Sequence, residues 1–529
     1  MAEPARLNPP DEVVDRRGES PRATEKDPTL GITVTVDRAG PEPHHRLVTI
    51  GDSLTHGFQS GAVFNTDVSY PAVIAHELGL GDQFRYPTYP GYGGLPLNIE
   101  LLLRELEERF GQELDWWEVP LALFHARRFL DEAEDYWERG PGSRDNQFAA
   151  INHNLAVYGW DLRDVLSKNA TVCRVKEPRD NLLHQVAQDS GNRAALRVLP
   201  PASIDGPGTM TLLDAAQHLG DEEAPDQKRG IETLIVFLGA NNALQTVTQL
   251  KVQWSGEEYR NLKAKEDFTV WDPSHFRDEL AEIIDEVAKI RARHVIWCTV
   301  PHVTIPPIAR GVGNKPQDSR YFPYYTRPWI SDLEFSPTRH PHLTAEQAQD
   351  IDTAIDLYNE AITDHVAKKR EAEGLDWLLM DTAGLLDRLA SRRYMEGEDP
   401  SNRPEWWEPY PLPAQLDALT PKPNSHFLTS NGKGRTDGGL FSLDGVHPST
   451  IGYGILAQEM INVMRRCGVE FRHPVSGNVR PDPVVVDFDR LLRRDTLIHR
   501  PPGNLTSGLN ILAWGQARLD LVKRALYFR

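Results

Sequence analysis

Short apolar runs and amphipathic stretches alternate along most of this chain. The apolar runs have the length of strands and lie at residues 47–50, 233–238, 294–300 and 377–380. Apolar residues recur at helical spacing in stretches at residues 70–78, 276–290, 345–369 and from 448 to about 465. Strands that are apolar throughout and alternate with helices are typical of a parallel sheet covered on both faces. We therefore expect an α/β fold in which a doubly wound, mostly parallel sheet lies between two helical layers.

The alternation is confined to a central region, residues 46–470, and is interrupted there. Three aromatic-rich stretches break it, near residues 84–150, 310–345 and 391–440. We expect these stretches to be insertions. Long loops of α/β proteins gather beyond the carboxyl ends of the strands, where ligands bind. Their aromatic residues, among them Trp116 and Trp406, are therefore expected either to cap a site or to anchor their own loops.

The two ends of the chain have a different composition. Residues 1–45 are polar and rich in proline, and the run 32–36 within them is compatible with one short edge strand. Residues 471–529 contain scattered apolar positions and a helical pattern that passes through Leu519 and Leu526. We expect this C-terminal extension to pack on the central region.

Composition excludes several classes of function. The formal net charge of −19 disfavours nucleic acid as a partner, because binding to phosphates depends on Lys and Arg. No apolar run approaches the ~20 residues of an integral membrane segment. The polar N-terminus lacks the apolar stretch of a secretory signal, and the three cysteines are few, so we expect a cytoplasmic protein. The histidine pairs, such as His44-His45, lack acidic or thiol ligands at useful spacing, and we expect neither a metal nor a cofactor.

Four short stretches carry the side chains that are able to take part in a reaction. They are Gly-Asp-Ser-Leu-Thr-His-Gly at 51–57, Asn-His-Asn-Leu-Ala-Val-Tyr-Gly at 152–159, Gly-Ala-Asn-Asn at 239–242 and Asp-Gly-Val-His-Pro at 444–448. The first and third follow predicted strands, and the last precedes a predicted helix. Each motif alone is a common turn or helix start. Their joint order, each at a strand end or a helix start, is more informative than any one of them.

In order and context, these stretches resemble the sequence blocks of the GDSL, or SGNH, hydrolase family over roughly residues 46–467. The resemblance implies the flavodoxin-like three-layer fold of that family and a nucleophile at Ser53. It implies catalytic roles for Asp444 and His447, which lie in the last block. It also assigns Gly159 of the second block and Asn241 of the third to the oxyanion hole, together with Ser53.

Two features depart from the family pattern. The third block commonly ends in aspartate, whereas this chain has Asn242, and the gap between Ser53 and Gly159 is wide. We expect Asn242 to change local hydrogen bonding more than chemistry. Asp52, Asn154 and Asn242 are expected to support the site.

These assignments define a chemical mechanism. A serine hydroxyl needs a base to remove its proton during attack, and the His447 imidazole can serve while Asp444 orients it. The Ser53 and Gly159 amides and the Asn241 side chain would stabilise the oxyanion. We expect an esterase, lipase or acylhydrolase that cleaves the carboxylic ester of a small molecule, with lipids and acylated glycans as candidates.

Two alternatives stay open. The same serine could transfer an acyl group to an acceptor other than water, or the fold could serve as a non-catalytic binding module. Other enzyme classes find no support, because the sequence lacks a G-x-S-x-G elbow, a phosphate-binding loop and an H-E-x-x-H zinc helix.

Overall fold

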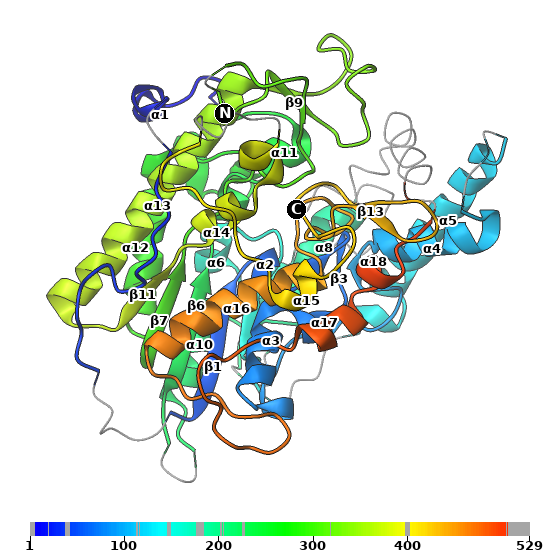
Figure 1. Ribbon diagram of the computed structural model, residues 1–529. Coiled ribbons are helices and arrows are strands. Elements are labelled where there is room, and N and C mark those ends of the chain that lie inside the picture. Colours follow the sequence, from blue (N-terminus) through cyan, green and yellow to red (C-terminus); the bar gives the residue numbers. More distant parts are fainter. Residues whose placement is uncertain are drawn as a thin grey trace.

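A computed structural model describes residues 6–18, 21–36, 43–112, 115, 117–144, 150–175, 185–201, 204, 206–224, 228–317, 319–396, 403–503 and 505. Its centre is a five-stranded sheet with the order β11-β7-β6-β1-β5, and every neighbouring pair is parallel (Figure 1). The strands are β1 (His45–Gly51), β5 (Asn154–Ala156), β6 (Ile231–Phe237), β7 (Ala292–Cys298) and β11 (Trp377–Met380). Counted along the chain, the order is 2-1-3-4-5, in which the direction of winding reverses between β1 and β6.

Helices cover both faces of this sheet. Alternate residues of the strands pack in two separate hydrophobic clusters, one on each face. Val48 of β1 and Val236 of β6 pack in one cluster with α6 (Leu162–Ser167), α10 (Leu212–Asp221), α12 (Pro273–Val287) and α13 (Ala345–Glu373). Leu47 and Phe237 pack on the other face with α3 (Tyr70–Glu77) and α16 (Thr450–Arg466). Figure 1 shows α12 and α13 on one side of the strands and α3 and α16 on the other. The predicted α/β architecture with a parallel sheet and two helical layers is confirmed.

The remaining elements surround these three layers. The other helices are α1 (Asp11–Arg16), α2 (Ser53–His56), α4 (Ile99–Phe110), α5 (Val119–Glu138), α7 (Ala170–Val175), α8 (Gln185–Ala195), α11 (Gln245–Gln249), α14 (Thr382–Leu389), α15 (Ala414–Asp417), α17 (Phe488–Arg494) and α18 (Thr496–His499). Short antiparallel sheets consist of β2 (Phe58–Gln59), β3 (Ala62–Val63) and β4 (Leu95–Pro96), of β8 (Arg310–Val312), β9 (Tyr324–Thr326) and β10 (Leu343–Thr344), and of β12 (Thr429–Ser430) and β13 (Arg435–Asp437). None of the helices in the described part of the chain combines the length and the hydrophobicity needed to cross a membrane.

The two extensions contact the central region. Near the N-terminus, α1 packs on α13. The prediction of a short edge strand at residues 32–36 is wrong, because no strand forms there. The Ile32 carbonyl accepts from the guanidinium of Arg370 instead of entering a sheet ladder. At the other end, α17 packs against α16, whereas the predicted helix through Leu519 and Leu526 lies outside the described residues.

Candidate active site

Ser53 lies at the carboxyl end of β1, where the winding of the sheet reverses. It is the first residue of the single-turn helix α2, and the Asp52 side chain caps this helix by accepting a hydrogen bond from Leu54 N at 3.1 Å. The turn from strand to helix is tight: a Cβ atom on Gly51 would lie 2.1 Å from Thr55 Oγ1. In doubly wound sheets the ligand crevice lies beyond the strand ends at such a reversal.

A hydrogen-bonded chain joins Ser53 to His447 and Asp444. His447 Nε2 lies 2.8 Å from Ser53 Oγ, and His447 Nδ1 lies 3.1 Å from Asp444 Oδ2. The side chains come from opposite ends of the sequence, yet all three residues are at most 5% exposed. The structure therefore brings together the three residues that the sequence assigned to catalysis.

Backbone amides hold the Asp444 carboxylate in place. Asp444 Oδ1 accepts from Val446 N and His447 N, both at 2.8 Å, and Oδ2 accepts from Gly61 N at 3.1 Å. Burial alone would raise the pKa of Asp444, but the His447 imidazole and these hydrogen bonds outweigh it and lower the pKa. The carboxylate is thus kept ionised beside the imidazole that it orients.

The predicted oxyanion-hole residues flank Ser53 on the two neighbouring strand ends. Gly159 follows β5 with φ of 76°, a conformation that favours glycine. Asn241 follows β6, and its Nδ2 donates to the carbonyl oxygen of Trp160, the residue after Gly159, at 2.9 Å. This contact uses one of the two hydrogens on the Asn241 amide group. All four sequence motifs thereby meet at the carboxyl ends of the central strands.

The three supporting residues make structural contacts around Ser53. Asn154 Nδ2 donates to Thr55 O at 2.9 Å, which ties β5 to α2. Asn242 Oδ1 accepts from Leu162 N at 3.4 Å, at the start of α6. The departure from the family pattern at Asn242 therefore falls on a buried residue that contacts the backbone near the site.

Sequence reasoning gave no role to His56, although it lies within the first motif. His56 Nδ1 accepts from Tyr158 N at 3.2 Å, and its Nε2 lies 2.8 Å from Tyr89 Oη. Burial lowers the pKa of His56 to about 3, so the ring is neutral and its remaining hydrogen points to Tyr89. His56 therefore positions the backbone that leads to Gly159. The histidine in this turn was visible in the sequence, but its partners were not.

Asp52 contributes a pH-dependent cost to folding. Burial raises the pKa of Asp52 to about 7, and its Oδ2 lacks a hydrogen-bond partner among the described residues. In the unfolded chain this pKa is about 4. The folded state therefore binds the proton more tightly than the unfolded chain. The free energy of unfolding falls as pH rises from about 4 to 7, and the full loss is present above pH 7.

We expect Asp52→Asn to raise the free energy of unfolding at pH 8 by on the order of 2–4 kcal/mol, and by much less at pH 4.5. Asparagine keeps the oxygen that caps α2 but removes the buried charge. Urea denaturation of both proteins at the two pH values measures the difference. A gain that is equal at both pH values, or a loss at pH 8, would contradict this account of Asp52.

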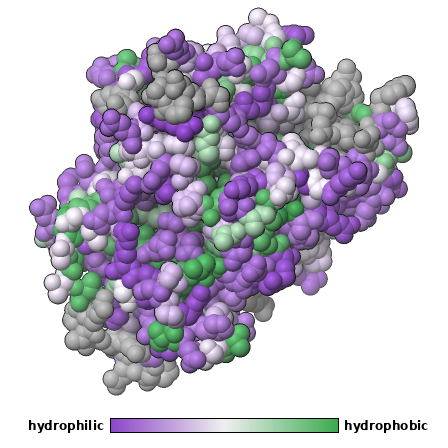
Figure 2. Space-filling model, in the orientation of Figure 1, coloured by the Kyte–Doolittle hydropathy of each residue, from purple (hydrophilic) through white to green (hydrophobic). Residues whose placement is uncertain are grey.

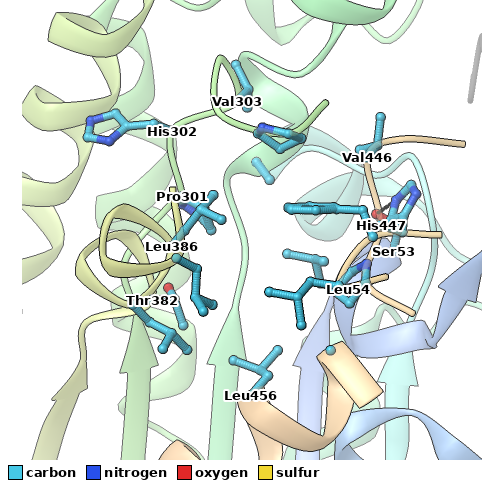
Figure 3. A pocket seen from close by; sticks show the side chains of 18 of the residues that line it. Ser53, Leu54, Pro301, His302, Val303, Thr382, Leu386, Val446, His447 and Leu456 are labelled. Atoms are coloured by element: carbon cyan, nitrogen blue, oxygen red, sulfur yellow. Dashed lines mark hydrogen bonds between the residues drawn. The ribbon is translucent and has the colours of Figure 1, made fainter. Parts of the chain in front are cut away.

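A mainly apolar cavity of about 120 Å³ opens beside Ser53 and His447 (Figure 3). Its walls come from α2, α14 and α16 and from the loop that follows β7. Apolar residues also gather toward the middle of the face in Figure 2, in the region where α14 and α2 lie in Figure 1. Sequence reasoning missed this cavity. The leucines at positions 385, 386 and 389, directly after the strand at 377–380, were the available signal.

The aromatic residues of the three expected insertions do not line this cavity within the described part of the chain. Some pack in small clusters, such as Tyr394 with Trp407 and Tyr89 with Trp137, whereas Tyr321 and others join the main core cluster. Trp116 lies outside the described residues. The lining of this cavity therefore gives no support to a cap built from the described aromatic residues.

A cluster of histidines lies at the other end of the central strands, at the start of β1. Possible ligand atoms of His44, His45 and Glu222 lie within 4.8 Å of one another. Arg85 N donates to His153 Nδ1 at 3.0 Å, so neutral His153 carries its hydrogen on Nε2, which points to His45 Nδ1 at 3.0 Å.

This tautomer decides what the cluster can bind. With Nδ1 accepting, the hydrogen of neutral His45 lies on Nε2, directed at Glu222 Oε2 3.1 Å away. Burial, with a contribution from His44, lowers the pKa of His45 to about 4, which keeps the ring neutral. The Nε2 atom that would bind a cation is therefore already occupied by a proton. The expectation that the protein uses no metal stays a prediction.

Comparison with known proteins adds no assignment: no family model matches the sequence, and neither a curated protein nor a solved structure matches it.

Proposed function

We propose that this protein is a serine hydrolase of the GDSL, or SGNH, type that cleaves carboxylic esters through an acyl-enzyme on Ser53. One observation carries the proposal: a buried hydrogen-bonded chain links Ser53, His447 and Asp444 at the edge of an apolar cavity. The arrangement matches the requirement of a serine nucleophile for an adjacent, oriented base.

The first half of the reaction forms the acyl-enzyme. Ser53 Oγ attacks the ester carbonyl carbon while His447 Nε2 takes the hydroxyl proton, and the carbonyl electrons move to its oxygen. The Ser53 and Gly159 amides and the free hydrogen of the Asn241 amide are the proposed donors to this oxyanion. When the oxyanion collapses, the C–O bond to the alcohol breaks and His447 returns the proton to the leaving oxygen.

The second half restores the enzyme by the same route. Water replaces the alcohol, His447 accepts one of its protons, and the resulting hydroxide attacks the acyl carbonyl. Collapse of this second oxyanion breaks the bond to Ser53 Oγ, which regains the proton from His447 and releases the carboxylic acid. Throughout, ionised Asp444 orients the ring and stabilises the imidazolium.

The fold supports this assignment. The sheet order, with Ser53 after the first strand of the central sheet, Asn241 after the third and His447 before α16, agrees with the architecture that the sequence resemblance implies. The four motifs meet at the carboxyl ends of the central strands although they are spread over residues 51–448. A binding module would have no need of the oriented imidazole.

A covalent probe tests the proposed nucleophile. We expect a fluorophosphonate to add one phosphonyl group to the peptide that contains Ser53, with displacement of fluoride, because its phosphorus accepts attack from an activated serine. Mass spectrometry of the digested protein locates the adduct. Heat-denatured protein should remain unlabelled.

Turnover of p-nitrophenyl butyrate by the same preparation separates the remaining alternatives. Labelling of Ser53 together with release of butyric acid supports a hydrolase. Labelling with butyryl transfer to an added alcohol as the main product would instead identify an acyltransferase. A folded protein that neither reacts with the probe nor turns over esters would contradict the proposal and favour a binding module.

A further inference from the structure

We propose that the apolar cavity beside Ser53 is the acyl-binding pocket and that it selects unbranched acyl chains of about four to six carbons, with α14 as its far wall. This inference rests on the proposed function and adds the substrate class to it. The occupant that it names is the acyl chain of an ester whose carbonyl carbon lies at Ser53 Oγ.

The geometry of the cavity places one end at the reacting atoms. Ser53 and His447 form one side, and Thr382 and Leu386 of α14 lie across the cavity from them (Figure 3). Leu456 of α16 closes the cavity from below in the same view. A chain attached to the carbonyl carbon at Ser53 would therefore extend toward α14.

The lining offers an acyl chain nothing polar to contact beyond the reacting groups. His302 contributes to the wall, but its ring points away from the cavity, toward Asp356 at 3.1 Å and Asp387 at 3.4 Å (Figure 3). The Thr382 hydroxyl donates to the Thr299 carbonyl. An acyl group with a charged or hydroxylated end would lose its hydration there without gaining a partner.

Several leucines of the lining are only half-buried. Leu54, Leu386 and Leu389 keep part of their apolar surface accessible at the cavity. Covering this surface is favourable, and each methylene that is buried raises transition-state affinity by roughly fourfold. An aliphatic chain that reaches α14 therefore binds more tightly than an acetyl group, which does not reach it.

The size of the cavity sets the upper limit. A cavity of about 150 Å³ holds benzene in a protein core. The cavity beside Ser53 measures about 120 Å³, so it accommodates about four to six carbons before the chain meets α14. Longer chains must bend out of the open side, where they gain no further contact.

Two ester series test which part of the substrate occupies the pocket. With p-nitrophenyl esters from acetate to dodecanoate, we expect kcat/KM to rise by about tenfold or more from acetate to butyrate or hexanoate and to fall beyond hexanoate. With acetate esters of alcohols of increasing length, we expect no such maximum. A maximum that follows the alcohol and not the acyl chain overturns the proposal.

Substitutions in α14 test the far wall. Leu386→Trp should lower the ratio of hexanoate to acetate turnover by at least tenfold, whereas Leu386→Ala should move the optimum to longer chains. Leu389→Phe, on the same helix, provides a second narrowed pocket if Leu386→Trp does not fold. The matched control is Leu333→Trp, because Leu333 is fully exposed and lies outside the cavity lining.

The outcomes separate the pocket from the chemistry. Failure of the folded wild-type protein to turn over any ester overturns the hydrolase proposal and the pocket with it. Turnover with an acyl-length profile that Leu386→Trp, Leu386→Ala and Leu389→Phe leave unchanged overturns the pocket alone. Opposite shifts for the narrowed and widened variants, with Leu333→Trp like wild type, support it.

Discussion

Replacing Ser53 with alanine is expected to lower kcat for p-nitrophenyl butyrate by about 10⁴- to 10⁶-fold while the protein stays folded. The substitution removes the oxygen that we propose forms the acyl bond, and it leaves His447 without the hydroxyl that now lies 2.8 Å from Nε2. Ser53 is small and 5% exposed, so little packing is lost. Initial rates with circular dichroism and thermal unfolding of the same samples measure both properties.

Ser69→Ala is the matched control for this experiment. Ser69 is also buried and lies in the same segment, but its hydroxyl caps α3 by accepting from Ala72 N. Loss of a helix cap costs about 1 kcal/mol of stability, and we expect no loss of turnover. Equal rates for Ser53→Ala and wild type would show that the hydrolysis does not use this serine.

The main layers of the fold were predictable because their signal is local. The strand β6 is buried at every position and apolar except at Glu232 and Thr233, and β11 is buried and apolar at all four of its positions. The helix α12 lies between them with one apolar face. Burial on both faces of a parallel strand and on one face of a helix leaves a pattern that the sequence shows directly.

Other elements left no such pattern. The strand β5 has only three residues, Asn154–Ala156, and lies at the edge of the central sheet beside β1, so the second motif carried no strand pattern. Residues 32–36 have the β-branched composition of a strand, but tertiary contacts with Arg370 take the place of a partner strand. In both segments, distant residues decide the local structure.

Some features of the candidate site could likewise be predicted from the sequence, and others could not. The candidate nucleophile, base and acid could be named because their residue types and order resemble those of a known family. The contact of Gly61 N with Asp444 and the role of His56 depend on neighbours hundreds or tens of residues away. The wall that α14 forms opposite Ser53 depends on how helices meet across the cavity, which spacing along the chain does not encode.

Asp444→Asn is expected to lower kcat by about 10⁴-fold, because it reverses the tautomer of His447. Two backbone amides, Val446 N and His447 N, donate to Asp444 Oδ1, so the carbonyl oxygen of an asparagine would occupy that place. Its amide group would then face His447 Nδ1 and donate to it. Neutral His447 would carry its hydrogen on Nε2, directed at Ser53 Oγ, and could not accept the serine proton.

Asp437→Asn supplies the matched control, since Asp437 Oδ2 contacts His426 Nδ1 at 2.6 Å in the same manner but outside the cavity beside Ser53. We expect this variant to turn over p-nitrophenyl butyrate like wild type. Steady-state kinetics of both variants, with unfolding curves to confirm that each is folded, distinguish orientation of the base from loss of any carboxylate that is paired with a histidine. If Asp444→Asn lost less than about tenfold in kcat, the tautomer of His447 would not limit the reaction and another group would have to orient the base.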